Sequence, residues 1–160
     1  MRTTSLEQAG VLCNTPEESL KSHHGRIMGE EPLYTMKQIS APMMPWPDSN
    51  DYERPLAGIR VIDFSRVIAA PAVSKLLAAL GADVLKVSHA ENPEIDILMV
   101  DMSTGKRDAF IDLKTSKGKK DFERLIIDAD ILIDGFRPGV LERLGYDSSS
   151  LRTLCPTTQY

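Results

Sequence analysis

A strand–helix–strand pattern constrains the fold of this chain more than any other sequence feature. Residues 59–64, Ile-Arg-Val-Ile-Asp-Phe, form a short β-branched run, and Ala and Leu dominate residues 72–80, just before Gly81. Residues 82–87, Ala-Asp-Val-Leu-Lys-Val, are a second apolar run. This pattern predicts a strand, a helix that ends at the glycine, and a second strand. Such a βαβ unit has parallel strands and a right-handed crossover.

The alternation continues towards the C-terminus, after a stretch that we expect to be irregular. The further expected elements are strands over 107–113 and 130–134, helices over 116–129, 140–144 and 149–154, and a turn over 135–139. Thr115 and Ser148 are the expected caps of the helices that follow them. Alternating strands and helices indicate an α/β domain, a parallel sheet with flanking helices.

The first fifty residues have a different character. Thr15-Pro16-Glu17-Glu18 has the residue order of a capping box and predicts a helix from about Pro16 to Met28. Residues 37–51 carry three of the ten prolines and little periodicity. We therefore expect a helical appendage over 1–36, a proline-rich linker over 37–54 and the α/β domain over 55–160.

Composition and charge disfavour several classes of partner. The 160 residues include 19 Lys and Arg against 23 Asp and Glu, a net charge of −4, so neither nucleic acid nor an anionic membrane surface is an expected partner. No apolar run has the length of a membrane-spanning helix, and no signal-peptide core is found at the start. Cys13 and Cys155 match no metal or redox spacing and are expected to be free thiols. We expect a cytoplasmic location, with mitochondria and peroxisomes as alternatives.

Candidate binding residues follow from the topology of a parallel sheet. Ligands collect where strands end, because turn amides and helix N-termini there offer donors to anions. The expected strand ends are 64–71, 88–92, 113–115 and 135–138. The first of these turns contains no glycine, so it is neither a dinucleotide fingerprint nor a P-loop. Ala69 and Ala70 would either admit the flat group of a ligand or pack strand against helix.

The basic residues near these ends leave two interpretations open. Lys106, Arg107, Lys114, Arg137 and Arg143 would together neutralise a phosphate-bearing ligand, or they would be solvated cations at element ends. His23 and His24 are adjacent, so on a helix they cannot grip one metal ion as an i, i+4 pair can. No nucleophile with a neighbouring base is found. The residues by themselves indicate an α/β domain with a possible anionic ligand.

Five ordered blocks resemble family III CoA-transferases, the group of formyl-CoA:oxalate and carnitine CoA-transferases and α-methylacyl-CoA racemase. The blocks are residues 55–71, 80–87, 105–107, 112–115 and 129–145, and the likeness extends from Pro55 to Tyr160. The resemblance implies a Rossmann-like CoA-binding domain in an intertwined homodimer, with coenzyme A as substrate, acyl-CoA and carboxylic acids as partners, and no metal.

The resemblance also implies a set of CoA contacts. By position these are Val67, Ile68, Ala69, His89, Ile111, Asp112, Leu113, Lys114, Gly135, Phe136, Arg137 and Arg143. Two positions depart from the family pattern. Ala70 stands where many members have Gly, and His89 replaces an Arg with a group whose charge depends on pH.

The family's catalytic aspartate and the racemase acid–base pair lie beyond the position that matches Tyr160. We therefore expect a CoA-binding portion of a CoA-transferase or racemase that is inactive alone and has no catalytic residue of its own. Residues 1–50 look like the closing segment of another copy, as in a tandem protein. The alternatives are a non-catalytic module that pairs with a longer paralogue and an unrelated flavodoxin-like nucleotide binder.

Overall fold

A computed structural model of the chain describes residues 15–37, 53–89 and 95–155. The chain divides into two compact units, Met1–Ser40 and Ala41–Tyr160. Cys13 and most of the expected linker lie outside the described residues.

The first unit contains two short helices, α2 (Pro16–Lys21) and α3 (His23–Glu30). The predicted capping box is confirmed, because Glu18 N–H donates to Thr15 Oγ1 (3.2 Å) and the Glu18 carboxylate accepts from Thr15 N–H (2.9 Å). The single helix predicted over 16–28 is wrong. Ser22 has an extended backbone and its hydroxyl caps α3 by accepting from Gly25 N–H, so the helix breaks there. No residue of either helix is buried.

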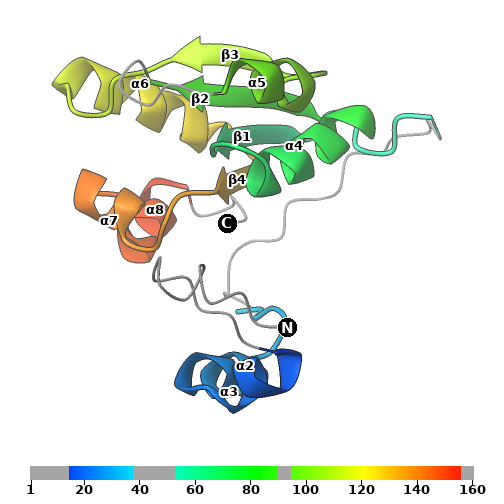
Figure 1. Cartoon of the computed structure of the whole chain (residues 1–160). Coiled ribbons are helices and arrows are strands. Elements are labelled where there is room, and N and C mark those ends of the chain that lie inside the picture. The colour runs from blue at the N-terminus through cyan, green and yellow to red at the C-terminus, as the bar shows by residue number, and fades with distance from the viewer. Residues whose placement is uncertain (1–14, 38–52, 90–94, 156–160) are drawn as a thin grey trace. The chain divides into compact units, whose positions relative to one another are not determined.

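The second unit is built on a parallel sheet of four strands (Figure 1). The strands are β1 (Arg60–Phe64), β2 (Asp83–Ser88), β3 (Arg107–Phe110) and β4 (Ile131–Asp134), in the order β3-β2-β1-β4. The helices are α4 (Ala69–Ala79), α5 (Asp96–Met102), α6 (Ser116–Ile127), α7 (Val140–Leu144) and α8 (Ser148–Leu154). The predicted α/β class, with a parallel sheet and flanking helices, is confirmed.

Helices cover both faces of the sheet, and the alternation of side chains along β1 separates two cores. Val61 packs on the α4 face with Ala82 and Val84. Ile62 and Phe64 point to the opposite face and pack against Phe122 of α6 and the residues of α7 and α8. Because successive strand residues face opposite sides, Asp63 lies on the same face as Val61. There it accepts a hydrogen bond from Ser74 of α4.

Several predicted boundaries are wrong, each for a local reason. The helix predicted from residue 72 begins at Ala69, because the first N–H groups of a helix need no intrahelical partner and Pro71 is tolerated in the first turn. The third strand ends at Phe110 rather than at 113. The stretch expected to be irregular contains α5. Asp147, not Ser148, caps α8, accepting from Ser149 and Ser150 N–H.

Candidate functional site

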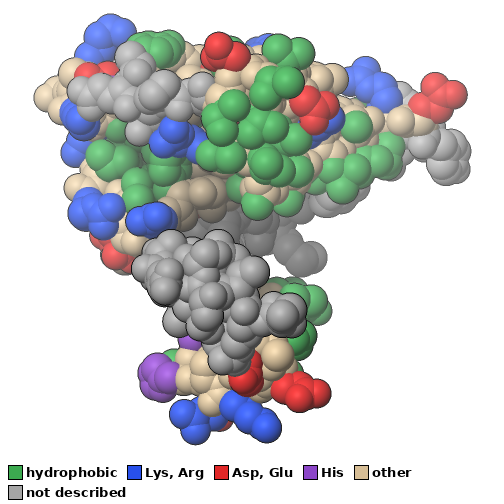
Figure 2. Space-filling model, viewed as in Figure 1, with side chains coloured by type: hydrophobic (Ala, Val, Ile, Leu, Met, Phe, Trp, Pro, Cys, Tyr) green, Lys and Arg blue, Asp and Glu red, His purple; other side chains and the backbone are tan. Residues whose placement is uncertain are grey.

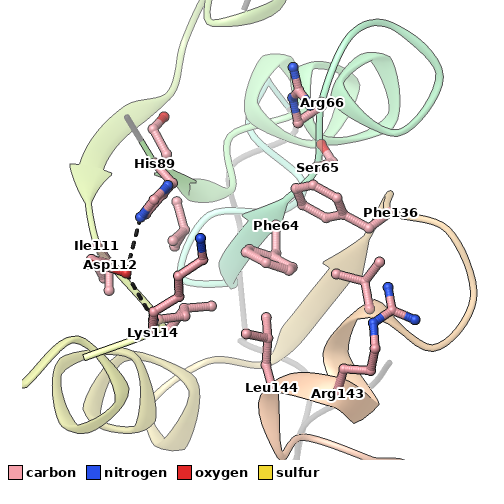
Figure 3. Close-up of a pocket in the computed structure, with 14 residues that line it drawn as sticks. Phe64, Ser65, Arg66, His89, Ile111, Asp112, Lys114, Phe136, Arg143 and Leu144 are labelled. Carbon is pink, nitrogen blue, oxygen red and sulfur yellow. Dashed lines mark hydrogen bonds and ion pairs between the residues drawn. The ribbon is translucent and has the colours of Figure 1, made fainter. Parts of the chain in front are cut away.

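A cavity of about 260 Å³ opens at the carboxyl edge of the sheet (Figure 3). The last residues of β1 and β2 and the residues that follow β1, β2 and β3 form most of its lining, and Phe136 after β4 and three residues of α7 complete it. The lining residues are Phe64, Ser65, Arg66, Val87, Ser88, His89, Ile111, Asp112, Leu113, Lys114, Phe136, Val140, Arg143 and Leu144. We call this cavity the carboxyl-edge pocket. Its place agrees with the rule that ligands bind outside the carboxyl ends of parallel strands.

The floor of the carboxyl-edge pocket is apolar and rigid. Phe64, Val87, Ile111 and Leu113 are each less than 10% exposed. The Phe64 ring lies 4.5 Å from the Phe136 ring, centroid to centroid. Packed aromatic and aliphatic groups of this kind offer a surface to a flat ring or an alkyl chain.

One wall of the pocket carries a histidine–carboxylate pair. His89 Nε2 lies 3.0 Å from Asp112 Oδ1, and the same oxygen accepts from Lys114 N–H at 2.9 Å. The backbone donor at Lys114, and with it the contact to His89, lowers the pKa of Asp112 below its ordinary value against the opposing effect of burial. The ring of His89 stacks on Phe110, with 8° between their planes. Asp112 is therefore a carboxylate that holds the imidazole at the wall.

Cationic side chains surround the floor from three elements. Arg66 follows β1, Lys114 precedes α6, and Arg143 lies on α7. In Figure 3 the Lys114 side chain extends into the same space as His89, and Arg143 lies on the side of Phe136 and Leu144. Asp112 is the single carboxylate among the lining residues. The described lining thus has more permanent cations than anions, which suits an anionic ligand.

The loop between β1 and α4 has a strained backbone. Val67 has a φ of 69°, in the left-handed region that β-branched residues rarely adopt. Such an outlier costs about 1–3 kcal/mol and persists only where the surroundings enforce it. The strain occurs directly after Ser65 and Arg66, which line the pocket.

The structure brings seven of the twelve expected contact residues together in the carboxyl-edge pocket: His89, Ile111, Asp112, Leu113, Lys114, Phe136 and Arg143. The other five, Val67, Ile68, Ala69, Gly135 and Arg137, are not among the lining residues. Val67 and Ile68 are about half exposed. Gly135 has a packing role, since a Cβ there would lie 2.5 Å from Ser65 Cβ and 2.6 Å from Ala70 Cβ.

Two cations from the sequence interpretation lie elsewhere. The Lys106 side chain is 1% exposed and pairs with Asp63, so it is not a solvated phosphate ligand. Arg107 begins β3, at the opposite edge of the sheet, where its guanidinium donates twice to Asp83. Neither residue lines the pocket, and the buried Lys106 is not a solvated cation either.

Sequence reasoning named no contact role for the remaining lining residues: Phe64, Ser65, Arg66, Val87, Ser88, Val140 and Leu144. The strand-end rule located three of these at the end of β1 and one at the end of β2. Val140 and Leu144 carried no such signal, because they reach the pocket only when α7 folds back beside Phe136. The described residues contain no cluster of three metal-ligating side chains.

A parallel α/β sheet with a cation-rich pocket at its carboxyl edge defines a class, the nucleotide- and coenzyme-binding α/β domains. Within that class the sequence matches one family, since residues 56–157 fit the family model of CoA-transferase family III. The chain belongs to CoA-transferase family III, and the resemblance noted in the sequence is confirmed.

Named relatives and solved structures agree with this assignment. The chain is 34% identical over 146 residues to an acetyl-coenzyme A transferase of Hypoxylon pulicicidum, covering 87% of this chain and 25% of the relative. It is 34% identical over 114 residues to a formyl-CoA:oxalate CoA-transferase of Escherichia coli, covering 64% and 27%. The chain therefore spans about a quarter of the length of these relatives.

Two crystal structures show the same fold. A hypothetical protein of Mycobacterium tuberculosis superposes with a TM-score of 0.61 at 33% identity, over 67% of this chain and 32% of that one. A CaiB/BaiF family protein of Brucella suis gives a TM-score of 0.58 at 30% identity, over 68% and 32%. Both likenesses support the Rossmann-like arrangement of the second unit.

Proposed function

We propose that the carboxyl-edge pocket binds the nucleotide end of coenzyme A, and that this chain supplies the CoA-binding part of a family III CoA-transferase or acyl-CoA racemase. The observation that carries the proposal is the lining itself. Arg66, Lys114 and Arg143 surround an apolar floor at the carboxyl edge, in a chain whose family is defined by CoA transfer.

The chemistry of coenzyme A fits such a lining. Its phosphates are multiply charged, and guanidinium and ammonium groups bind phosphate oxygens through charge-assisted hydrogen bonds. The flat adenine would lie against the floor formed by Phe64 and Ile111, with Phe136 beside it. His89 adds a further donor when protonated. Val67, Ile68, Ala69, Gly135 and Arg137 would then contribute from the loops beside the pocket rather than from its lining.

The proposed reaction moves CoA between carboxylic acids through a carboxylate outside the matched region. Asp112, the carboxylate of the pocket lining, is already engaged by His89 and by Lys114 N–H, which supports a positioning role rather than a nucleophilic one. Acyl-CoA and a free carboxylic acid are the proposed substrates.

We also propose the domain limits 1–36, 37–54 and 55–160 and a cytoplasmic location. No helix in the described part of the chain is long and apolar enough to cross a membrane.

Calorimetric titration of the full 160-residue chain tests the proposal. We expect CoA and adenosine 3′,5′-bisphosphate to compete for one site, because the pocket would hold the nucleotide end, and pantetheine to bind far more weakly. Lys114→Ala should weaken CoA binding by about tenfold or more, the loss of one charge-assisted contact. Arg124→Ala removes an exposed cation of α6, the helix that follows Lys114, and lies outside the pocket lining, so it is the control. Absence of heat at millimolar CoA would refute the pocket assignment.

An exposed apolar face favours a second proposal, that this unit associates with another copy or with a longer paralogue. Val73 and Leu76 of α4 and Ile97 and Val100 of α5 are each more than half exposed. Apolar side chains gather over these two helices in Figure 2. An exposed cluster of this kind is typical of an interaction surface. Light scattering on the purified chain should give at least the mass of a dimer. Leu76→Lys should reduce that mass. A wild-type monomer at about 100 μM would argue for a heterologous partner.

A further inference from the structure

A buried ion pair is joined to Ser65 of the carboxyl-edge pocket, and the proposed ligand chemistry does not use it. Lys106 Nζ lies 2.8 Å from Asp63 Oδ2, and the two side chains are 1% and 0% exposed. The same ammonium donates to Ser74 Oγ at 2.7 Å and to the Pro71 carbonyl at 2.9 Å. All three of its protons therefore have acceptors, which a buried ammonium requires.

The carboxylate of this pair holds the loop that lines the pocket. Ser65 Oγ donates to Asp63 Oδ1, and Ser74 Oγ donates to Oδ2 at 2.6 Å. Lys86, the register partner of Asp63 on β2, is also buried. The network joins the end of β1, the start of α4 and the residue before β3.

The two ends of the strained loop are both in this network. Ser65 is bound on one side of Val67, and the Pro71 carbonyl and Ser74 are bound on the other. Gly135 lies on the third side, where a Cβ would be 2.5 Å from Ser65 Cβ and 2.6 Å from Ala70 Cβ, so there is no room for a larger residue. A left-handed Val67 persists only where the surroundings determine the path of the chain, and these contacts determine it.

Stability does not explain the charges. Burying an ion pair costs desolvation that its attraction barely repays, and apolar replacements are often as stable. The structural consequence specific to this pair is the fixed position of Ser65 and Arg66, which line the pocket.

We propose that Lys106 and Asp63 are positioning residues of the ligand site: they hold residues 65–68 in the path that presents Ser65 and Arg66 to the pocket, and so raise its affinity. For the identity of the ligand this rests on the proposed function. A loop that samples other paths would bind with an affinity reduced by the fraction of time it is correctly placed.

The test compares the full chain with the double variant Asp63→Asn/Lys106→Met, which removes both charges of the pair and nearly keeps the side-chain volumes. Hydrogen exchange by mass spectrometry on peptides covering 64–73 should be at least about fivefold faster in the variant, because opening is easier where contacts are removed. CoA affinity, measured well below the unfolding temperature, should fall about tenfold. Peptides of α6 should exchange at the wild-type rate.

Two further variants keep the outcome decisive. Ser74→Ala removes the hydroxyl that bonds both Asp63 and Lys106 and keeps both charges of the pair, and it should accelerate the same peptides by a smaller factor even if the double variant fails to fold. Arg107→Met removes an exposed ion pair at the residue next to Lys106. It should change neither the exchange rate nor the CoA affinity. Wild-type protection of 64–73 in the folded double variant, or in Ser74→Ala, would overturn the inference. If the wild type binds no CoA, the proposed function fails, and the exchange data alone decide on positioning.

Discussion

The two edges of the sheet use the same residue types in opposite ways. At the amino edge, each strand begins at or next to a charged residue. In sheet order these are Arg107 of β3, Asp83 of β2, Arg60 of β1 and Asp130, which precedes β4. Arg107 Nη2 donates to Asp83 Oδ1 at 2.7 Å, and Arg60 N–H donates to Asp130 Oδ2 at 2.8 Å. Cation and anion alternate across the strands, so the described amino edge is neutral.

At the carboxyl edge the balance is different. Arg66, Lys114 and Arg143 line the pocket, where Asp112 is the single carboxylate of the lining. Asp134, the last residue of β4, lies outside the lining and accepts from Phe136 N–H. A cation at a strand end is thus no signal of ligand binding by itself. What matters is whether a neighbouring strand offers a carboxylate within reach of the side chain, as Asp83 of β2 does for Arg107 of β3, and this depends on strand order.

The largest effect on the carboxyl edge is expected from Gly118, where the backbone of α6 packs closely against the loop that precedes it. A Cβ at Gly118 would lie 1.9 Å from the Asp112 carbonyl oxygen, so Gly118→Ala must push the β3–α6 loop away from α6. We expect a loss of about 3 kcal/mol in the free energy of unfolding, measured in urea, together with weaker CoA binding. Gly29→Ala is the control, because a methyl there meets no atom within 4 Å. Equal effects of the two substitutions would contradict the packing argument.

Charge reversal compares the two edges directly. Arg143→Glu places an anion in the pocket and should weaken CoA binding by about 10- to 100-fold, since a charge-assisted contact becomes a repulsion. Arg107→Glu, on the other edge, should leave the affinity within about twofold, because the charge lies a strand length away and is screened by salt. Calorimetry at 150 mM salt measures both. A similar loss in both variants would show that net charge, not the pocket, attracts the ligand.

High pH should lower the stability of the packing between α6 and Tyr146, the residue that follows α7 and Gly145. Tyr146, beside α7, is buried against Phe122, and its hydroxyl donates to Glu123; burial first, then Glu123, raises its pKa to about 12. In the unfolded chain the phenol ionises near its ordinary pKa of 10.0. The neutral phenol therefore contributes its full stability below pH 10, and this is lost between pH 10 and about 12. Denaturant midpoints should fall over that range in wild type and less steeply in Tyr146→Phe; parallel curves would contradict the assignment.

Much of the fold followed from local pattern. The β-branched runs, the capping box at Thr15 and the αL glycine after α7 each report a backbone preference that acts over a few residues. The helix break at Ser22 and the helix α5 were missed because neither has a strong local signal. The carboxyl-edge location of the pocket followed from parallel topology alone.

The local pattern did not predict the environment of each basic side chain. Lys106, Arg107 and Lys114 lie within nine positions of one another and look equivalent as letters. One is buried on Asp63, one is paired across the amino edge, and one lines the pocket. The carboxylate partners of Lys106 and Arg107 are 43 and 24 residues away along the chain, and only the packed sheet brings them together.

The sequence by itself determined the α/β class and the edge of the sheet where the pocket forms, because these depend on periodicity and on the order of elements, and its ordered residue blocks resembled the family that the family model then matched. The tertiary structure alone decided which basic side chains line the pocket there and which pair with carboxylates elsewhere. Lys106 and Arg107 are engaged by carboxylates of other strands, and in a parallel sheet those strands come from distant parts of the chain.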